Sequence, residues 1–143
     1  MFSVYHLRNS AAFIRAVQNA TLHRPGYGIE VTHGLFGSEE WWNNIATGKL
    51  LLATISGTIS RVGMDSMGDW PEFDLLADGQ PTTWNRETDK REFDSLYCVG
   101  VHAEIDYVVQ WLKKEALLIP GMRDREQKVV IEIRLATPRH RLA

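Results

Sequence analysis

The stretch at residues 101–112, VHAEIDYVVQWL, decides the fold class of this sequence. Its odd-numbered residues are apolar throughout, and most of its even-numbered residues are polar or charged. This period of two is typical of a β-strand with one buried face and one solvated face. We therefore expect the odd positions to point into a core, namely Val101, Ala103, Ile105, Tyr107, Val109 and Trp111.

Residues 50–60 and 129–135 follow the same alternation, with apolar side chains mainly at odd positions. Gly57 lies inside the first of these segments and predicts a bulge or a sharp bend. The connection between the 101–112 strand and the last strand contains Pro120-Gly121, which suggests a two-residue turn. Such a turn would pair odd with even positions and point one apolar face outward. We therefore expect a bulge or a loop of odd length in this connection.

Two shorter strands are expected between these segments. Phe73 and Leu75 alternate with acidic residues, and Asp78-Gly79 is a strong β-hairpin signal that leads into a strand at 82–85. Residues 86–97 are mostly hydrophilic and predict a short helix or an ordered loop.

This order of elements resembles the OB-fold, a five-stranded, partly open antiparallel barrel, over residues 50–136. The sequence therefore predicts a mainly β (α+β) single domain spanning residues 1–143. Its first 49 residues form a lead-in with two short helices packed on the barrel, and residues 137–143 form a flexible basic tail. An SH3-like barrel, or an open sheet packed on the helices, is the alternative architecture.

Composition favours a cytoplasmic protein without a disulfide framework. The chain has 143 residues, 44% of them hydrophobic, and one cysteine, Cys98, which suits a reducing compartment. Its first residues lack the pattern of a signal peptide, and no stretch approaches the roughly 20 apolar residues that cross a bilayer. We expect no membrane association.

Charge is distributed unevenly along the chain. Residues 51–112 carry eleven acidic and four basic side chains, a net charge of −7, whereas residues 113–143 carry eight basic and four acidic ones, a net charge of +4. An OB-type barrel binds single strands on a face that here includes Glu72 and Asp74, and these carboxylates would repel phosphate. Nucleic-acid binding is therefore disfavoured.

The sequence contains no motif that predicts an enzyme, a metal site or a cofactor. His102, Glu104 and Asp106 share one face of the 101–112 strand, but side chains two residues apart on a strand are about 7 Å apart. That spacing is typical of a solvated strip. Cys98 lacks any partner motif and reads as a small buried side chain. We predict a protein without catalytic residues.

The residues between the last two strands favour contacts with another protein. Residues 116–119 are apolar in a loop where a soluble monomer would normally have polar residues, and basic side chains flank them. The predicted function is a small non-enzymatic binding or adaptor domain whose partner is another protein or a second copy. The alternative is an OB-type single-stranded nucleic-acid-binding protein. The candidate surface consists of Lys113, Lys114, Leu117, Leu118, Ile119, Arg123, Arg125, Trp70 and Trp84.

Overall fold

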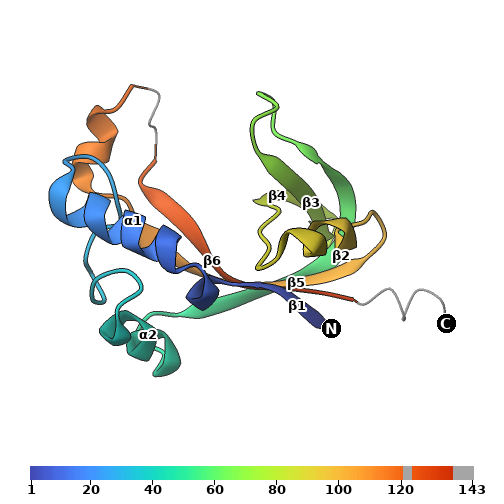
Figure 1. Cartoon of the computed structure of the whole chain (residues 1–143), viewed down its shortest axis with the longest axis horizontal. Coiled ribbons are helices and arrows are strands. Elements are labelled where there is room, and N and C mark those ends of the chain that lie inside the picture. Colours follow the sequence, from blue (N-terminus) through green and yellow to red (C-terminus); the bar gives the residue numbers. More distant parts are fainter. Residues whose placement is uncertain (121–123, 137–143) are drawn as a thin grey trace. The chain divides into compact units, whose positions relative to one another are not determined.

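The computed structural model describes residues 1–120 and 124–136, and within them the chain is mainly β (Figure 1). The elements in chain order are β1 (Phe2–His6), η1 (Leu7–Asn9), α1 (Ala11–His23), α2 (Glu39–Ala46), β2 (Leu52–Met64), β3 (Pro71–Ala77), β4 (Gln80–Asn85), η2 (Arg91–Leu96), β5 (His102–Trp111), η3 (Lys114–Leu118) and β6 (Glu126–Leu135). The three η elements are short 3-10 helices.

The strands form an open, six-stranded antiparallel sheet in the order β1-β6-β5-β2-β3-β4. The predicted mainly β class is confirmed, but the five-stranded barrel is wrong. A sixth strand, β1, comes from the lead-in that we expected to be helical, and it pairs with β6 from Phe2↔Leu135 to His6↔Glu132. The two edge strands β1 and β4 are not paired with each other, so the sheet does not close. A backbone hydrogen bond from Asp89 N–H to Val4 O joins the segment after β4 to β1.

The chain divides into two compact units, which are described separately. Among the described residues, unit 1 comprises Met1–Asn9, Thr54–Asp106 and residues 131–136, and unit 2 comprises Ser10–Ala53 and residues 107–120 and 124–130. Each of β2, β5 and β6 contributes residues to both units. The single domain over 1–143 stays a prediction, and the predicted tail at 137–143 lies outside the described residues.

Unit 1 has an apolar core built from the predicted inward positions. Alternation is confirmed in its parts of β5 and β6, where odd-numbered side chains are buried. Phe73 of β3 packs on Tyr97, with 5.0 Å between the ring centroids. The fully buried aliphatic side chains of this core include Ile59, Leu75, Ile105, Ile133 and Leu135.

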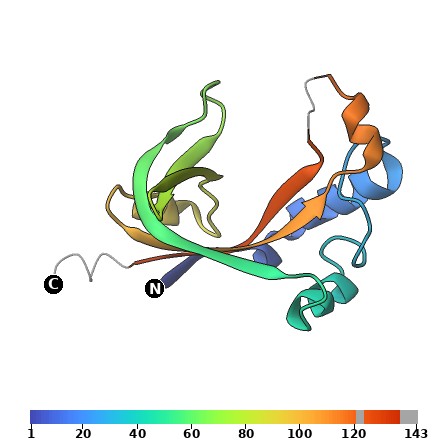
Figure 2. The same ribbon diagram turned by 180° about the vertical axis from the view of Figure 1, so that it is seen from behind.

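Two predicted backbone features of unit 1 are confirmed. Asp78 and Gly79 have φ angles of 51° and 76°, and they join β3 to β4 in the hairpin of Figure 1. Both central residues of a type I′ turn require positive φ, which explains this Asp-Gly pair. At Gly57 a Cβ atom would collide with the Leu76 carbonyl oxygen. The register of β2 with β3 shifts just beyond it, between Ile59 and Arg61, and Figure 2 shows β2 bending along its length.

Unit 2 packs its helices around a core that contains a polar pair. Ser38 caps α2, because its side chain accepts the backbone N–H of Trp41 at 3.2 Å. Trp41 is fully buried, and its indole N–H donates to Gln110 Oε1 at 3.0 Å. Gln110 Nε2 in turn donates to Thr32 Oγ1 at 3.3 Å, so both the oxygen and the nitrogen of this buried amide are hydrogen-bonded.

The predicted inward face of β5 is wrong for the half of the strand that belongs to unit 2. There the buried residues are Val108 and Gln110, at even positions, while Val109 and Trp111 are exposed. The physical reason is the hydrogen bond to Trp41. A buried indole N–H needs an acceptor, and Gln110 supplies it only if the even positions face the core of unit 2.

The expected irregularity between the last two strands is a register shift within the pairing of β5 with β6, and not in the connection itself. In unit 1, Ala136 N–H donates to His102 O, and in unit 2, Leu112 N–H donates to Arg125 O. In a regular antiparallel pair, the numbers of two paired residues always add up to the same total. Here the total is even for His102 with Ala136 and odd for Leu112 with Arg125, so the register shifts between these two pairs. The described part of the connection contains η3 in place of a two-residue turn.

Candidate functional site

A short segment after α1 lines one side of the candidate site in unit 2. Thr21 of α1 is buried, and its hydroxyl both accepts from Ile29 N–H and donates to Ile29 O. Ile29 forms a β-bridge with Leu112, and Glu30 N–H donates to Trp111 O at 2.7 Å. These bonds hold Glu30 beside the end of β5.

Arg125, at the start of β6, lies next to the same two residues. Its Nη2 forms an ion pair with Glu30 Oε2 at 2.9 Å, and its guanidinium carbon is 5.8 Å from the centre of the Trp111 ring. Its Nε is buried and has no hydrogen-bond partner among the described residues. The arginine is therefore held in place by one ion pair and one aromatic ring, with part of its donor capacity unused.

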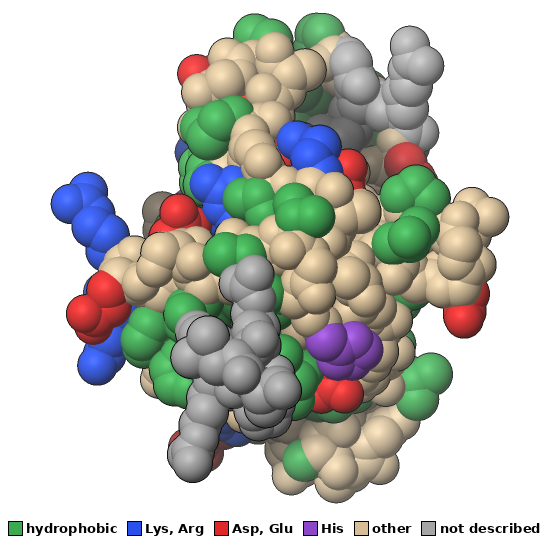
Figure 3. All heavy atoms as spheres, turned by 90° about the vertical axis from the view of Figure 1, so that its right-hand side faces the viewer, with side chains coloured by type: hydrophobic (Ala, Val, Ile, Leu, Met, Phe, Trp, Pro, Cys, Tyr) green, Lys and Arg blue, Asp and Glu red, His purple; other side chains and the backbone are tan. Residues whose placement is uncertain are grey.

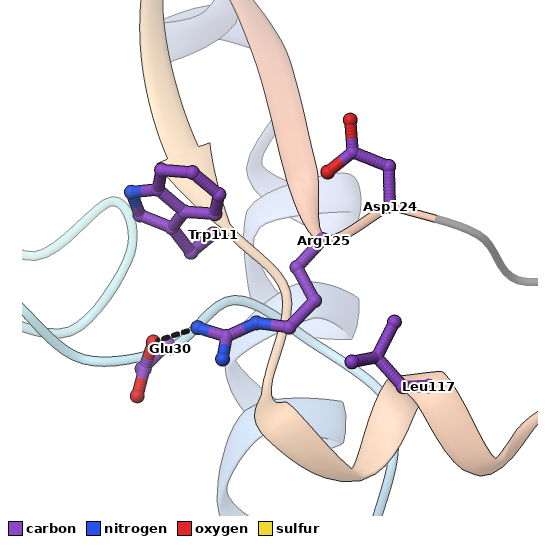
Figure 4. A pocket seen from close by; sticks show the side chains of 5 residues that line it. All are labelled: Glu30, Trp111, Leu117, Asp124 and Arg125. Carbon is purple, nitrogen blue, oxygen red and sulfur yellow. Dashed lines mark hydrogen bonds and ion pairs between the residues drawn. The ribbon is translucent and has the colours of Figure 1, made fainter.

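These residues surround an open hollow of about 490 Å³, lined by Glu30, Trp111, Leu117, Asp124 and Arg125 (Figure 4). Figure 4 shows the Arg125 side chain extending between Trp111 and Leu117 toward Glu30. Trp111 is 42% exposed and Leu117 is 50% exposed. Exposed tryptophan and arginine side chains are the residue types that most often dominate the binding energy of protein interfaces.

The loop residues predicted from sequence occupy different environments in unit 2. Leu118 is 84% exposed and Lys114 is also exposed. Lys113 is engaged, because its Nζ donates to the carbonyl oxygens of Ala20 and Arg24 at the end of α1, each at 3.3 Å. Positive charge at that position stabilises a helix C-terminus.

Ile119 is half-buried against the turn that follows α1. A Cβ atom placed on Gly26 would lie 3.6 Å from Ile119 Cδ1, so the two segments are in close contact. Arg123, also predicted, lies outside the described residues.

The two predicted tryptophans belong to unit 1. Trp84 is buried, and its indole N–H donates to Thr82 Oγ1 at 2.7 Å, so its ring is part of the unit 1 core. Trp70 is 50% exposed in the loop before β3, where its backbone N–H and carbonyl both bond to Asp65.

Sequence reasoning did not assign Trp111, Glu30 and Asp124 to the site. Trp111 is one of the odd-numbered apolar residues of the 101–112 strand, so the sequence predicted that it faces the core. One available signal was Val108, an apolar residue at a position predicted to face solvent. Glu30 had no such signal, because 95 positions of sequence separate it from Arg125.

The outer face of β5 and β6 in unit 1 carries an ion-pair network. Arg134 bonds to Asp106 through Nη1 and Nη2 at 2.8 and 2.9 Å, and also reaches Glu104 and Glu132. The bonds from Arg134, followed by one from Thr54, hold the pKa of Asp106 below its usual range. His102 is exposed at the same end of β5, and the described residues contain no group of three or more side chains that could hold a metal ion.

A second network covers the outer face of β2 and β3. Arg61 pairs with Asp74 at 2.9 Å and with Glu72 at 2.6 Å. The hydrogen bond from Arg61 to Asp74, followed by one from Thr83, lowers the pKa of Asp74. Unit 1 still keeps a strong excess of negative charge, since its described residues include twelve Asp/Glu and six Lys/Arg, a net charge of −6. Figure 3 shows charged and hydrophobic side chains interspersed over one face of the molecule.

The fold and the site together define a small, mainly β protein with an exposed tryptophan and a half-buried arginine beside the exposed Leu117. The sequence matches the family described as Immunity protein RhsI2 over residues 1–136, and the chain belongs to this family. An immunity protein acts by binding a partner protein, so the protein-interaction role predicted from the sequence is confirmed at that level. No curated protein sequence matches the chain. No helix in the described ranges is long and apolar enough to cross a membrane.

Proposed function

We propose that this protein neutralises a toxin protein by binding it directly, without catalysing a reaction, and that it acts in the cytoplasm. Membership of the immunity protein family supports a protein partner. The absence of a catalytic motif in the sequence supports an action by binding alone. The single cysteine supports a reducing compartment such as the cytoplasm.

The observation that carries the proposed binding surface is the grouping of Trp111, Leu117 and Arg125 around the hollow of unit 2, with the exposed Leu118 next to Leu117 in the chain. We call these four residues the hairpin surface. Its apolar members are 42% to 84% exposed, although burial of such side chains stabilises a protein by about 1.5–3 kcal/mol each. A partner that covers them recovers this free energy, and Arg125 adds a planar donor group at the centre.

The electrostatics of unit 1 disfavour the alternative, a single-stranded nucleic-acid binder. Sequence-independent affinity for nucleic acid comes mainly from Lys and Arg contacts to phosphate. Unit 1 has a net charge of −6 over its described residues, and Arg61, on its outer face, is already paired with Asp74 and Glu72. A basic phosphate-binding strip is therefore not available there.

Calorimetric titration of the purified protein with its cognate toxin domain tests the proposal. We expect a one-to-one complex that Trp111→Ala weakens by about 2 kcal/mol or more, roughly 30-fold, as for a central interface tryptophan. Leu118→Asp should weaken it as well, because the substitution introduces an unpaired charge into a desolvated interface. Cells that express the toxin should be protected by the parent protein and less well by either variant.

Matched controls come from exposed residues outside the hairpin surface. Leu51→Asp replaces a leucine that is 75% exposed in unit 2, and Trp70→Ala replaces a tryptophan that is 50% exposed in unit 1. Neither control should change affinity by more than about 0.5 kcal/mol. Equal losses in variants and controls would refute the hairpin surface, and failure to bind the toxin at all would refute the function. Sedimentation separates a toxin complex from self-association.

A further inference from the structure

The hollow of unit 2 has an excess of one negative charge among its lining residues. Glu30 and Arg125 neutralise each other through their 2.9 Å ion pair. Asp124 remains, and it has no ion-pair partner within the part of the chain that the structure describes. Its Oδ1 accepts the backbone N–H of Glu126 at 3.0 Å, which orients the carboxylate and leaves Oδ2 unoccupied among the described residues.

Apolar surface lies within the same hollow. Trp111 offers an aromatic ring that is 42% exposed, and Leu117 offers an aliphatic side chain from η3. A cation is attracted to the face of a tryptophan ring, and this interaction is worth about 0.5–1 kcal/mol at an exposed site. The long stem of a lysine or arginine buries well against apolar side chains while its charged end reaches an acidic group.

From this combination we infer that the hollow receives a basic side chain, lysine or arginine, of the partner protein. Its charged end pairs with Asp124, and its stem packs on the exposed parts of Trp111 and Leu117 that Arg125 leaves uncovered. This inference rests on the proposed function for the nature of the partner and adds the chemistry of the group that the hollow recognises.

The preference for a basic group is a local property of the hollow. Unit 2, which contains the hollow, has seven Lys/Arg and six Asp/Glu over its described residues, a net charge of +1. Long-range steering depends on net charge, so the recognition of a cation here depends on the short-range attraction of the Asp124 carboxylate. A partner that presents an acidic side chain to the hollow would meet repulsion from Asp124, the one lining carboxylate that Arg125 does not neutralise.

Three short peptides test the inference without the toxin. They are acetyl-Gly-Lys-Leu-Gly-amide and its counterparts with norleucine or glutamate in place of lysine. Binding is followed by NMR through the indole N–H signal of Trp111, which Trp111→Phe identifies among the five tryptophans. We expect millimolar binding of the lysine peptide, at least twofold weaker binding of the norleucine peptide, and no measurable binding of the glutamate peptide.

Asp124→Asn is the decisive variant, because it removes the charge and keeps the size of an exposed side chain. It should reduce lysine-peptide affinity about two- to fivefold, the range for an exposed ion pair, and Asp124→Glu should restore most of it. The inference is overturned if no peptide moves the Trp111 signal, if the glutamate peptide binds as well as the lysine peptide, or if Asp124→Asn changes nothing. Lysine-peptide binding without toxin binding would instead contradict the proposed function and leave the cation site standing.

Discussion

Unit 1 and unit 2 use the same strands to make two different kinds of core. In unit 1 the buried positions are apolar, they follow the sequence alternation, and charged residues pair with each other on the outer face. In unit 2 a tryptophan and a glutamine are buried together, and an aromatic side chain of the strand is left exposed. The first arrangement suits stability, and the second leaves an apolar surface for a partner.

The comparison shows that one polar residue can decide which side chains a strand exposes. Gln110 is 1% exposed and is the acceptor for the Trp41 indole. Because side chains alternate along a strand, burial of Gln110 and Val108 exposes Val109 and Trp111. The surface proposed for toxin binding is therefore a consequence of how the core of unit 2 satisfies its hydrogen bonds.

The largest expected effect is on the apolar core of unit 1. Phe73→Ala removes a fully buried ring that packs on Tyr97, and it should lower the free energy of unfolding by about 3–5 kcal/mol. Leu76→Ala, on the same strand but exposed, should cost less than about 1 kcal/mol. Urea denaturation followed by circular dichroism gives both values. Similar losses for the two variants would mean that alternation does not define this core.

The next effect concerns the polar pair of unit 2. Gln110→Leu leaves the buried Trp41 N–H without an acceptor and should cost about 1–3 kcal/mol. Trp41→Phe removes the donor of the same hydrogen bond. The double variant Gln110→Leu/Trp41→Phe should therefore lose less free energy of unfolding than the sum of the losses in the two single variants. Denaturation of the parent protein, the two single variants and the double variant, followed by fluorescence, measures the interaction energy between the two side chains. Strictly additive losses would show that the hydrogen bond does not set the exposed face of β5.

Removal of the central arginine of the outer network in unit 1 should have a smaller effect. Arg134→Met leaves Glu104, Asp106 and Glu132 without their shared cation, and we expect a loss of about 1–2 kcal/mol after allowance for solvent screening. Arg91→Met, at an exposed position of η2, is the matched control. A loss that disappears in 1 M salt would identify the effect as electrostatic, whereas one unchanged by salt would point to packing.

The smallest effect is the pH dependence that Asp106 contributes. Its pKa is lowered in the folded protein by Arg134, so the unfolded chain binds the proton more readily. This contribution to stability is fully present above the unfolded pKa of about 3.9 and is lost as pH falls through the folded pKa. Asp106→Asn should therefore make the stability curve shallower below about pH 4. An unchanged acid limb, measured by thermal unfolding, would contradict this assignment.

The sequence alone determined the local features of this protein. A period of two identified β2, β3, β5 and β6, and Asp78-Gly79 fixed the hairpin, because both signals arise from backbone geometry and neighbouring residues. Leu117 and Arg125 were also predicted as surface candidates, since an apolar loop beside basic residues is unusual in a soluble protein.

Only the tertiary structure decided the sixth strand and the exposed face of β5. The pairing of Phe2 with Leu135 joins residues at opposite ends of the chain, and no local pattern in the first residues encodes it. The alternation of apolar and polar residues predicts a strand with two different faces. Which face is buried depends on the groups that pack against the strand. In unit 2 that group is the Trp41 indole, and its need for an acceptor places Gln110 inside and Trp111 at the hollow.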